Sequence, residues 1–505
     1  MASRIVAVIA ALAVAGLTLG PVLAVLFRAG GWGALGPGDL QAVRFTLVQA
    51  LLSAGASVAL AVPVARALGR RRFRGRGALV ALMGAPFILP VIVAVLGLIA
   101  VFGQNGLLNG ALRGLGLPEI SIYGLHGVVL AHVFFNLPLA VRLLLQGWLA
   151  IPAERFRLAA SLGLTDRAVF RMLELPMLLR IAPGAFAVIF VICLSSFAVA
   201  LTLGGGPRAT TVELAIYQAV RFDFDLGRAA LLSVVQLALA LAAGLIALKL
   251  GTGNGFGSGL DRVQQRWDGR GRLRRAADAG WIALAALFLL VPLAMVAVKG
   301  IGGLSMLGAS TWQAAGNSIA VALASTLLCI LWALPLASRR GELLGLAGIA
   351  LSPLVLGTGL FLIVRPFVNP LSLALLVTVV VNALVSLPFA LRILRPEAES
   401  VRADYARLAQ ALGLTPLAWV RLVLLPRLRR PLGFAAGLTA ALSMGDLGVI
   451  ALFADPDRAT LPLQVYRLMG AYRMEAASGA ALLLLMLSFA AFWVFDRGGR
   501  MHADA

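Results

Sequence analysis

Few side chains in this 505-residue chain have the types and spacing needed for chemistry. The three histidines, His126, His132 and His502, show no metal-ligand spacing and no catalytic grouping with a serine and an acid. The two cysteines lie inside apolar runs, where a thiol usually packs as a small hydrophobic group. The two lysines precede Leu250 and Gly300, so no Gly-Lys-Ser or Gly-Lys-Thr phosphate loop exists. We therefore expect no enzymatic activity, metal site or cofactor in this chain.

Polar side chains interrupt several of the apolar runs. His132 and Asn136 stand one helical turn apart, and Asp446 is the clearest charge in the interior of another run. Such groups either line a solute pathway or bind a neighbouring helix. We predict pathway residues at His132, Asn136, Ser195, Ser196, Glu213, Ser443 and Asp446. For His132 and Asn136, helix-to-helix hydrogen bonding is the alternative. For Asp446 the alternative is a capped residue that faces protein. Glu213 could instead be a solvated loop charge or contact a partner.

Apolar residues dominate the composition. Hydrophobic residues make up 61% of the chain and charged residues 13%, about half the charged share of a soluble domain. A helix crosses a bilayer with about 20 apolar residues. Runs of this kind lie near residues 5–27, 41–65, 78–102, 124–147, 182–203, 228–248, 279–298, 311–337, 343–364, 371–391, 431–453 and 475–495. We predict an all-α polytopic membrane protein with about twelve transmembrane helices.

The positive charge of the chain follows the predicted topology. Its net charge is +22, and most of its 43 lysines and arginines fall in alternate loops, on the side of Arg4. Because basic loops near span ends stay in the cytoplasm, we predict that both termini are cytoplasmic. The charge is therefore no sign of a nucleic-acid partner.

The sequence contains an internal repeat. Residues 136–142 (NLPLAVR) recur as 386–392 (SLPFALR), a shift of 250 residues, and 162–165 (LGLT) recur at the same shift as 412–415. Pro63 pairs instead with Pro335, a shift of 272, so the second copy is shorter, and we expect loop 103–123 to be the missing piece. We predict two parallel halves of six spans, residues 1–250 and 278–505, joined by a Gly-rich cytoplasmic linker, 251–277.

The best-matched parts of the repeat are two polar loops, residues 152–176 and 397–426, called here the first and second repeated loops. We predict helices over 154–162 and 402–412, each stopped by a left-handed glycine, Gly163 or Gly413. Thr165 and Thr415 then cap a second helix, which we expect to end before Pro176 in the first copy. A rigid element presented twice suits docking into a symmetric partner; a plain connection between spans is the alternative.

At these loops the chain resembles the inner-membrane permeases of binding-protein-dependent ABC importers. Their signature is Glu-Ala-Ala, three residues, Gly, and a Leu-Pro about a dozen residues later; the signature glutamate is Arg157 and Arg407 here. The resemblance implies a type I ABC importer permease fold in a bacterial inner membrane, with each loop bound by one of two ATPase subunits that use ATP and Mg. The matching residues implied in coupling are Ala159, Ala160, Gly163, Thr165, Pro176, Ala409, Gly413, Thr415 and Pro426.

Four stretches of the first half narrow the resemblance. Residues 45–50, 123–127, 131–138 and 203–218 look like those of thiamine and thiamine pyrophosphate permeases. This resemblance implies ATP-driven import of thiamine and its phosphates, delivered by a periplasmic receptor, through alternating access of two half-bundles in the bilayer. A ferric-iron or other ABC permease of the same fused design, and an ATP-independent secondary transporter, stay as alternatives.

Overall fold

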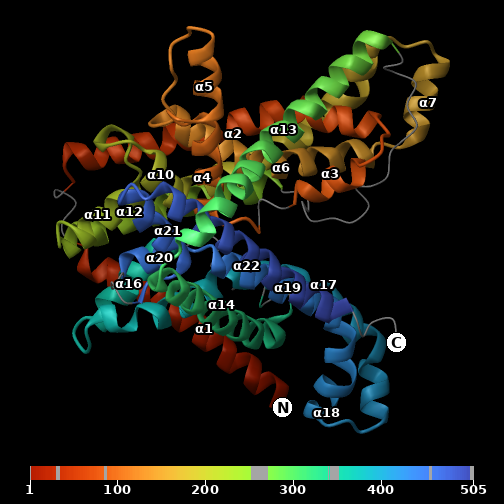
Figure 1. Cartoon of the computed structure of the whole chain (residues 1–505). Helices are drawn as coiled ribbons and strands as arrows, with labels where there is room; N and C mark the ends of the chain where they lie inside the picture. The colour runs from red at the N-terminus through yellow and green to blue at the C-terminus, as the bar shows by residue number, and fades with distance from the viewer. Residues whose placement is uncertain are drawn as a thin grey trace.

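The fold is a bundle of long helices (Figure 1). The computed structural model describes residues 2–29, 35–84, 88–251, 271–338, 341, 352–453 and 458–500, and within these ranges it contains no strand. Up to residue 251 the helices are α1 (Ala2–Arg28), α2 (Pro37–Arg70), α3 (Arg76–Leu82), α4 (Val91–Phe102), α5 (Leu107–Gly114), α6 (Leu125–Ala150), α7 (Ala153–Ser161), α8 (Asp166–Val169), the π-helical turn η3 (Phe170–Glu174), α9 (Leu175–Leu194), α10 (Ala198–Leu203), η4 (Pro207–Ala209), α11 (Val212–Arg221) and α12 (Leu226–Leu250).

The later part of the chain repeats much of this order. Its helices are α13 (Arg272–Gly303), η5 (Leu304–Met306), α14 (Ala309–Leu336), α16 (Pro353–Val364), η6 (Pro370–Leu373), α17 (Ala374–Ala411), α18 (Pro416–Trp419), the π-helical turn η7 (Val420–Leu424), α19 (Leu425–Met444), α20 (Gly448–Leu452), α21 (Leu461–Gly470) and α22 (Met474–Arg500). The order from α8 to α12 thus returns from α18 to α22, which confirms the predicted all-α repeat architecture. Most of the predicted linker, residues 252–270, lies outside the described residues.

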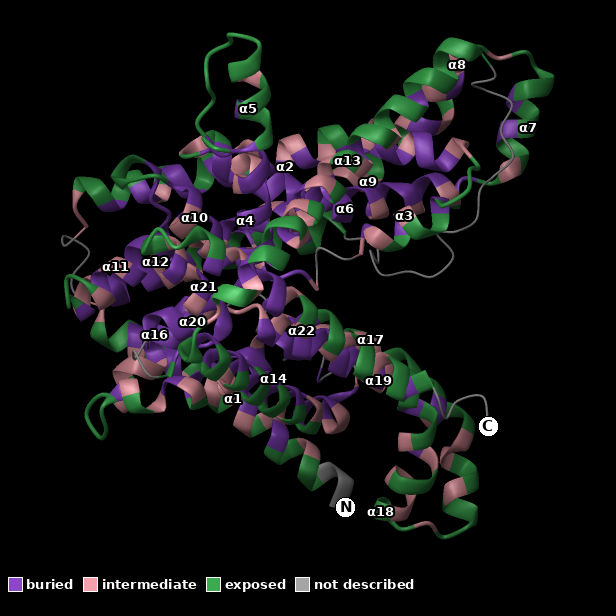
Figure 2. Ribbon diagram, in the orientation of Figure 1, coloured by how far each residue is buried: buried purple, intermediate pink, exposed green. Residues whose placement is uncertain are grey.

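Within the described residues, eleven helical segments are long and apolar enough to cross a membrane. The twelfth predicted span, 343–364, is described only from residue 352, where α16 forms a shorter apolar helix. Exposed leucines such as Leu287 and Leu323 cover the outer faces of the long helices, as expected for surfaces that meet lipid (Figure 2). The prediction of a polytopic membrane protein is confirmed.

Three of the predicted spans are wrong as continuous helices. The span predicted over 78–102 consists of α3 and α4, and α4 begins directly after Pro90, whose ring restricts the residue before it. The spans predicted over 182–203 and 431–453 break after Leu194 and after Met444. Ser195 and Ser196 follow the first break, and Gly445 and Asp446 follow the second. At the second break Asp446 Oδ1 accepts the amide of Gly448, a local bond that competes with the helix.

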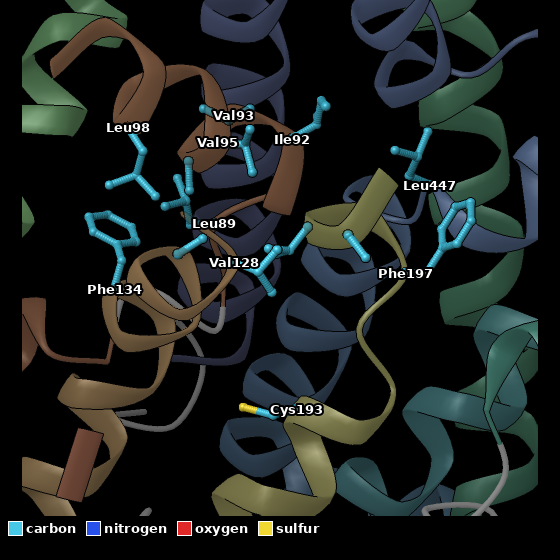
Figure 3. Packing of buried hydrophobic residues seen from close by; sticks show 14 of the residues in the cluster. Leu89, Ile92, Val93, Val95, Leu98, Val128, Phe134, Cys193, Phe197 and Leu447 are labelled. Atoms are coloured by element: carbon cyan, nitrogen blue, oxygen red, sulfur yellow. The ribbon is translucent and has the colours of Figure 1, made fainter. Parts of the chain in front are cut away.

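The first helix of each half lies against the other half. α1 packs on α16 and α14, while α13 packs on α4 and α2. The two halves are therefore interlocked rather than simply apposed. Their shared core includes Leu98, Phe134 and Phe197 from the first half and Leu447 from the second (Figure 3).

The extra segment expected in the first half is a projecting hairpin. It follows α4, contains α5 and stands out from the bundle in Figure 1. Asn109, which is buried, closes it by donating to the carbonyls of Gly103 (3.0 Å) and Ile120 (2.8 Å). Between α16 and α17 the second half has nine residues, including η6, where the first half has 22 between α4 and α6. The predicted place of the length difference is therefore confirmed in part, because this segment accounts for 13 of the 22 missing residues.

Candidate functional site

The two repeated loops share one backbone geometry. Gly163 has φ +63° and Gly413 has φ +61°, the left-handed region that favours glycine. In each loop the next residue donates its amide back to the carbonyl five residues earlier, Leu164 to Ala159 and Leu414 to Ala409, both at 3.0 Å. This hydrogen bond closes a Schellman turn, so the predicted glycine stops are confirmed.

A threonine begins the second helix of each loop, as predicted. Thr165 Oγ1 accepts the amide of Ala168 (3.4 Å), and Thr415 Oγ1 accepts the amide of Ala418 (3.2 Å). These bonds satisfy amides that a helix start leaves without an intrahelical partner.

The prediction that the second helix ends before Pro176 is wrong. In both copies the helix passes through a π-helical turn, η3 or η7, and continues through Pro176 or Pro426 into the next span. In a π turn the amide of Leu175 bonds the carbonyl of Phe170, five residues back. The wider turn accommodates a proline that can neither donate a hydrogen bond nor fit a regular helix interior.

The separate helix predicted over 402–412 is also wrong. α17 runs unbroken from the span to Ala411, whereas in the first half α6 ends at Ala150 and α7 starts after Pro152. Arg402 holds the place of Pro152 at the shift of 250 and donates to the carbonyl of Ala337. Pro152 has no amide to continue the helix and is the N-cap of α7. α17 nevertheless contains Pro388 and Pro396, so proline alone does not account for the difference.

Both repeated loops expose apolar side chains at matching positions. Leu158 and Leu408 are 60% and 54% exposed, and Leu162 and Leu412 are each 65% exposed. α7 and α18 extend from the same end of the molecule and are exposed along most of their length (Figures 1 and 2).

The charges on the first repeated loop are mostly solvated. Glu154, at the start of α7, accepts from Arg157 at 2.6 Å, and both side chains are exposed. A hydrogen bond with its own backbone, and then this arginine, hold the pKa of Glu154 below its usual range. An exposed ion pair of this kind contributes little to stability.

His132 and Asn136 lie in a buried polar cluster of the first half. The His132 ring reaches Ser53 Oγ through Nδ1 (3.1 Å) and Ser196 Oγ through Nε2 (2.6 Å). Asn136 donates to the carbonyl of His132 (2.9 Å) and lies 3.5 Å from Cys193 Sγ. His132 thus joins α6 to α2 and to the residues after α9, and Asn136 bonds within α6 and lies near Cys193 of α9. Both make helix contacts, and their part in a solute pathway stays a prediction.

Two glutamines complete this cluster and were missed by the sequence analysis. Gln49 donates to the carbonyl of Cys193 (2.7 Å), and Gln236 donates to the carbonyl of Leu194 (3.1 Å). Both carbonyls lie at the end of α9, where helical partners run out. Each glutamine is an uncharged polar residue inside an apolar run, which is the signal that marked His132 and Asn136.

The second half has a smaller cluster at the matching place. Asn382 donates to Ser443 Oγ (3.0 Å), and Ser443 donates to Ser325 Oγ (3.1 Å). Asn382 occupies the position of His132 at the shift of 250, and Ser325 that of Ser53 at the shift of 272. The two clusters are therefore copies of one another in which the histidine has become an asparagine.

Asp446 lies in the break between α19 and α20. Its Oδ1 accepts the amide of Gly448 (3.2 Å), while its Oδ2 is enclosed and has no hydrogen-bond partner in the described part of the chain. The break also meets the first half, because a Cβ at Gly448 would lie 3.7 Å from the Phe197 ring. Figure 3 shows Phe197 beside Leu447 at this junction. The capped role predicted as the alternative for Asp446 therefore holds for Oδ1 but not for Oδ2.

Glu213 is 1% exposed at the start of α11, which excludes the solvated-loop alternative. Its Oε1 lies 3.5 Å from Gln236 Nε2. Ser195, the remaining predicted residue, is partly buried in the break after α9. The predicted residues of the first half thus lie around the end of α9. Glu213 contacts this group through Gln236.

Long apolar helices, discontinuous spans with polar clusters, and two exposed helical loops define a membrane permease. No protein-family model matches the chain. It is 38% identical to the thiamine transport system permease protein ThiP of Brucella abortus (strain 2308) over 507 residues, covering 96% of this chain and 93% of that protein. ThiP of Escherichia coli (strain K12) is 41% identical over 474 residues, or 90% and 88%, and ThiP of Haemophilus influenzae 34% over 499 residues, or 93% and 92%. The chain belongs to the family of thiamine transport system permease proteins.

Part of the chain is also similar to a permease with another cargo in its name. A probable sulfate transport system permease protein, cysT, from Helicosporidium is 29% identical over 205 residues, 40% of this chain. Its thiamine permease relatives make the chain an ABC permease, a transport subunit of an inner membrane.

Proposed function

We propose that this chain is the transmembrane subunit of an ATP-driven importer that moves thiamine and its phosphates from a periplasmic receptor into the cytoplasm. Two copies of a separate ATPase, which use ATP and Mg, bind the two repeated loops, and both termini of the chain face the cytoplasm. The matching exposed leucines on two equal Schellman turns are the observation that carries the proposal. Family membership supports thiamine as the cargo.

The two half-bundles, built from residues 1–250 and 278–505, move as rigid bodies in this proposal, and each carries the first helix of the other half, which packs on it. Each repeated loop continues through a π-helical turn into α9 or α19, so a displacement of the loop is passed directly to the helix break beyond. The breaks meet where Phe197 faces Gly448. ATP binding draws the two loops together and opens this junction toward the receptor, and hydrolysis resets it.

We place the solute pathway at this junction. Ser195, Ser196 and Asp446 lie in the two breaks, where discontinuous helices of transporters commonly form binding sites. Thiamine carries a permanent positive charge, and the enclosed Oδ2 of Asp446 offers a carboxylate to it. His132, Asn136, Ser443 and Glu213 hold the helices around the breaks through the hydrogen bonds described above.

Transport into proteoliposomes tests the cargo and the energy source. The chain, its ATPase and the receptor are reconstituted together, and uptake of labelled thiamine is compared with uptake of ferric iron. We expect thiamine uptake that requires ATP, the ATPase and the receptor. Iron uptake in place of thiamine would reassign the cargo, and thiamine uptake without the ATPase would indicate a secondary transporter.

Substitution of the loop glycines tests the coupling role. A Cβ at Gly163 or Gly413 meets nothing within 4 Å, so a new side chain is opposed only by the left-handed backbone. That conformation costs an L-residue about 1–2 kcal/mol, and asparagine tolerates it better than valine. We expect Gly163→Val or Gly413→Val to lower thiamine uptake per ATP hydrolysed, and the matched Gly→Asn variants to retain most of it. Equal coupling in all four variants would remove the case for these loops.

A further inference from the structure

The projecting hairpin of the first half, residues 103–123, has an apolar outer surface. Leu108, Ala111 and Leu115 recur at the spacing of one helix face, and Leu115 is 74% exposed. The exposed apolar residues of its return arm are Leu117 and Ile120. Figure 2 shows the hairpin as exposed along most of its length. Exposed apolar residues gathered on one element mark a contact with another apolar surface.

The polar side chain at the centre of the hairpin points inward. Asn109 is fully buried, and its amide group donates to two carbonyls, those of Gly103 and Ile120. Its Oδ1 accepts the amide of Ile120 at 2.9 Å. These bonds join the two arms and satisfy backbone groups that the short helix leaves without partners.

The hairpin also neutralises its own charge. Arg113 and Glu119 are the only charged residues between positions 103 and 123, and they pair with each other at 3.1 Å. Arg113 donates further to the carbonyl of Gln104 at 3.0 Å. Polar groups are thus paired within the hairpin while leucines face outward, the reverse of the arrangement expected in water. Internal pairing of polar groups is what an apolar environment requires.

The base of the hairpin is fixed to the loop after α10. The amide of Gly124 donates to the carbonyl of Leu203 at 2.8 Å, and a Cβ at Gly205 would lie 3.0 Å from that of Tyr123. Both segments belong to loops on the proposed outer side, opposite the repeated loops. The hairpin therefore starts at the outer part of the bundle.

The hairpin leaves the bundle sideways. In Figure 1, α7 and α18 mark one end of the molecule, and α11 and α16 lie at the other. α5 points across the line between these ends and stands back from the end that α11 forms. A receptor that docks at this outer end would meet α11 and α16 first. A hairpin directed along the plane of the bilayer meets lipid instead.

We propose that this hairpin lies in the outer leaflet of the bilayer, at the boundary between headgroups and acyl chains. Amphipathic segments bind there by burying their apolar face in the lipid. The leucines lie among acyl chains, and the paired Arg113 and Glu119 lie at the headgroups. The proposal uses the proposed orientation only to assign the leaflet, and it is independent of the cargo and of the ATPase. Because the second half lacks the hairpin, this contact anchors one half alone.

Collision measurements on spin-labelled protein test this contact. The full-length chain in lipid nanodiscs carries one introduced cysteine at a time; Cys193 and Cys329 are buried, and the unsubstituted chain gives their background labelling. Leu115→Cys reports on the hairpin. Leu162→Cys is the matched control, a similarly exposed leucine on the first repeated loop, and Leu287→Cys on α13 is the lipid reference. Collisions with oxygen, which concentrates in lipid, are compared with collisions with a water-soluble nickel chelate.

We expect the label at Leu115 to collide mainly with oxygen, as at Leu287, and the label at Leu162 to collide mainly with nickel. Leu117→Cys repeats the measurement on the return arm, in case a label at Leu115 disturbs the turn. Nickel collisions at both hairpin positions as frequent as those at Leu162 would overturn the proposal. Loss of those nickel collisions only after the receptor is added would assign the hairpin to the receptor, which also rejects lipid as its partner.

Discussion

The two repeated loops have nearly the same backbone, but a buried polar contact holds the first to the bundle and an apolar contact holds the second. In the first half, Glu174 is fully buried at the end of η3, where it accepts from Arg66 and, at 3.1 Å, from Trp148 Nε1. In the second half the same position is Leu424, which is 5% exposed and packs in an apolar cluster with Leu428. The repeat therefore preserves the shape of the loop and its exit helix, while the interior contact is free to be an ion pair or a hydrophobic one.

This difference predicts an unequal response to substitution, which is the largest effect we expect. Glu174→Leu places the second-half residue in the first half and removes the carboxylate from Arg66 and Trp148. Breaking a buried ion pair costs about 3–5 kcal/mol; Arg66 is 25% exposed, so we expect about 2–3 kcal/mol here. The measurement is thermal unfolding of the purified chain in detergent, followed by loss of helical circular dichroism.

Leu424→Met is the matched control for that substitution. A swap that conserves volume in an apolar site costs under about 1.5 kcal/mol, so its melting temperature should fall less than that of Glu174→Leu. If Glu174→Leu is as stable as the unaltered chain, the ion pair is not what secures the first loop.

The polar clusters at the helix breaks also differ between the halves, with His132 in the first and Asn382 in the second. Exchanging these residues should change the melting temperature less than Glu174→Leu does. His132→Asn gives the first cluster the residue of the second and removes one of two contacts, with Ser53 or with Ser196. A hydrogen bond between transmembrane helices contributes about 0.6 kcal/mol. We therefore expect a small fall in melting temperature with thiamine uptake largely retained.

The outcome separates structure from transport. Asn136→Ala, which removes the bond to the carbonyl of His132, serves as a control for loss of packing in the same helix. Loss of uptake in His132→Asn with no change in melting temperature would show that the histidine contacts the solute instead of supporting the helices.

The sequence predicts the features that local residues determine. The Leu-Gly-Leu-Thr pattern is sufficient for a left-handed turn and a threonine cap, because both depend on residues within five positions. The contacts of Gln49 and Gln236 join residues 144 and 42 positions apart, so no local pattern indicates which carbonyls they bind. The sequence does not predict that the helix continues through Pro176, because no residue pattern indicates the π-helical turn before it.

The last expected difference between the two copies concerns the threonine caps, and it is a local one. Pro416 follows Thr415 at the first helical position, whereas Asp166 follows Thr165. Proline sets the backbone angle that a helix start requires, so the second cap depends less on its threonine. A lost cap costs about 1 kcal/mol. We expect Thr165→Ala to reduce the hydrogen-exchange protection of the Ala168 amide more than Thr415→Ala reduces that of Ala418. An equal loss would mean that the proline does not organise the second loop, and that the two copies differ only in their buried contacts.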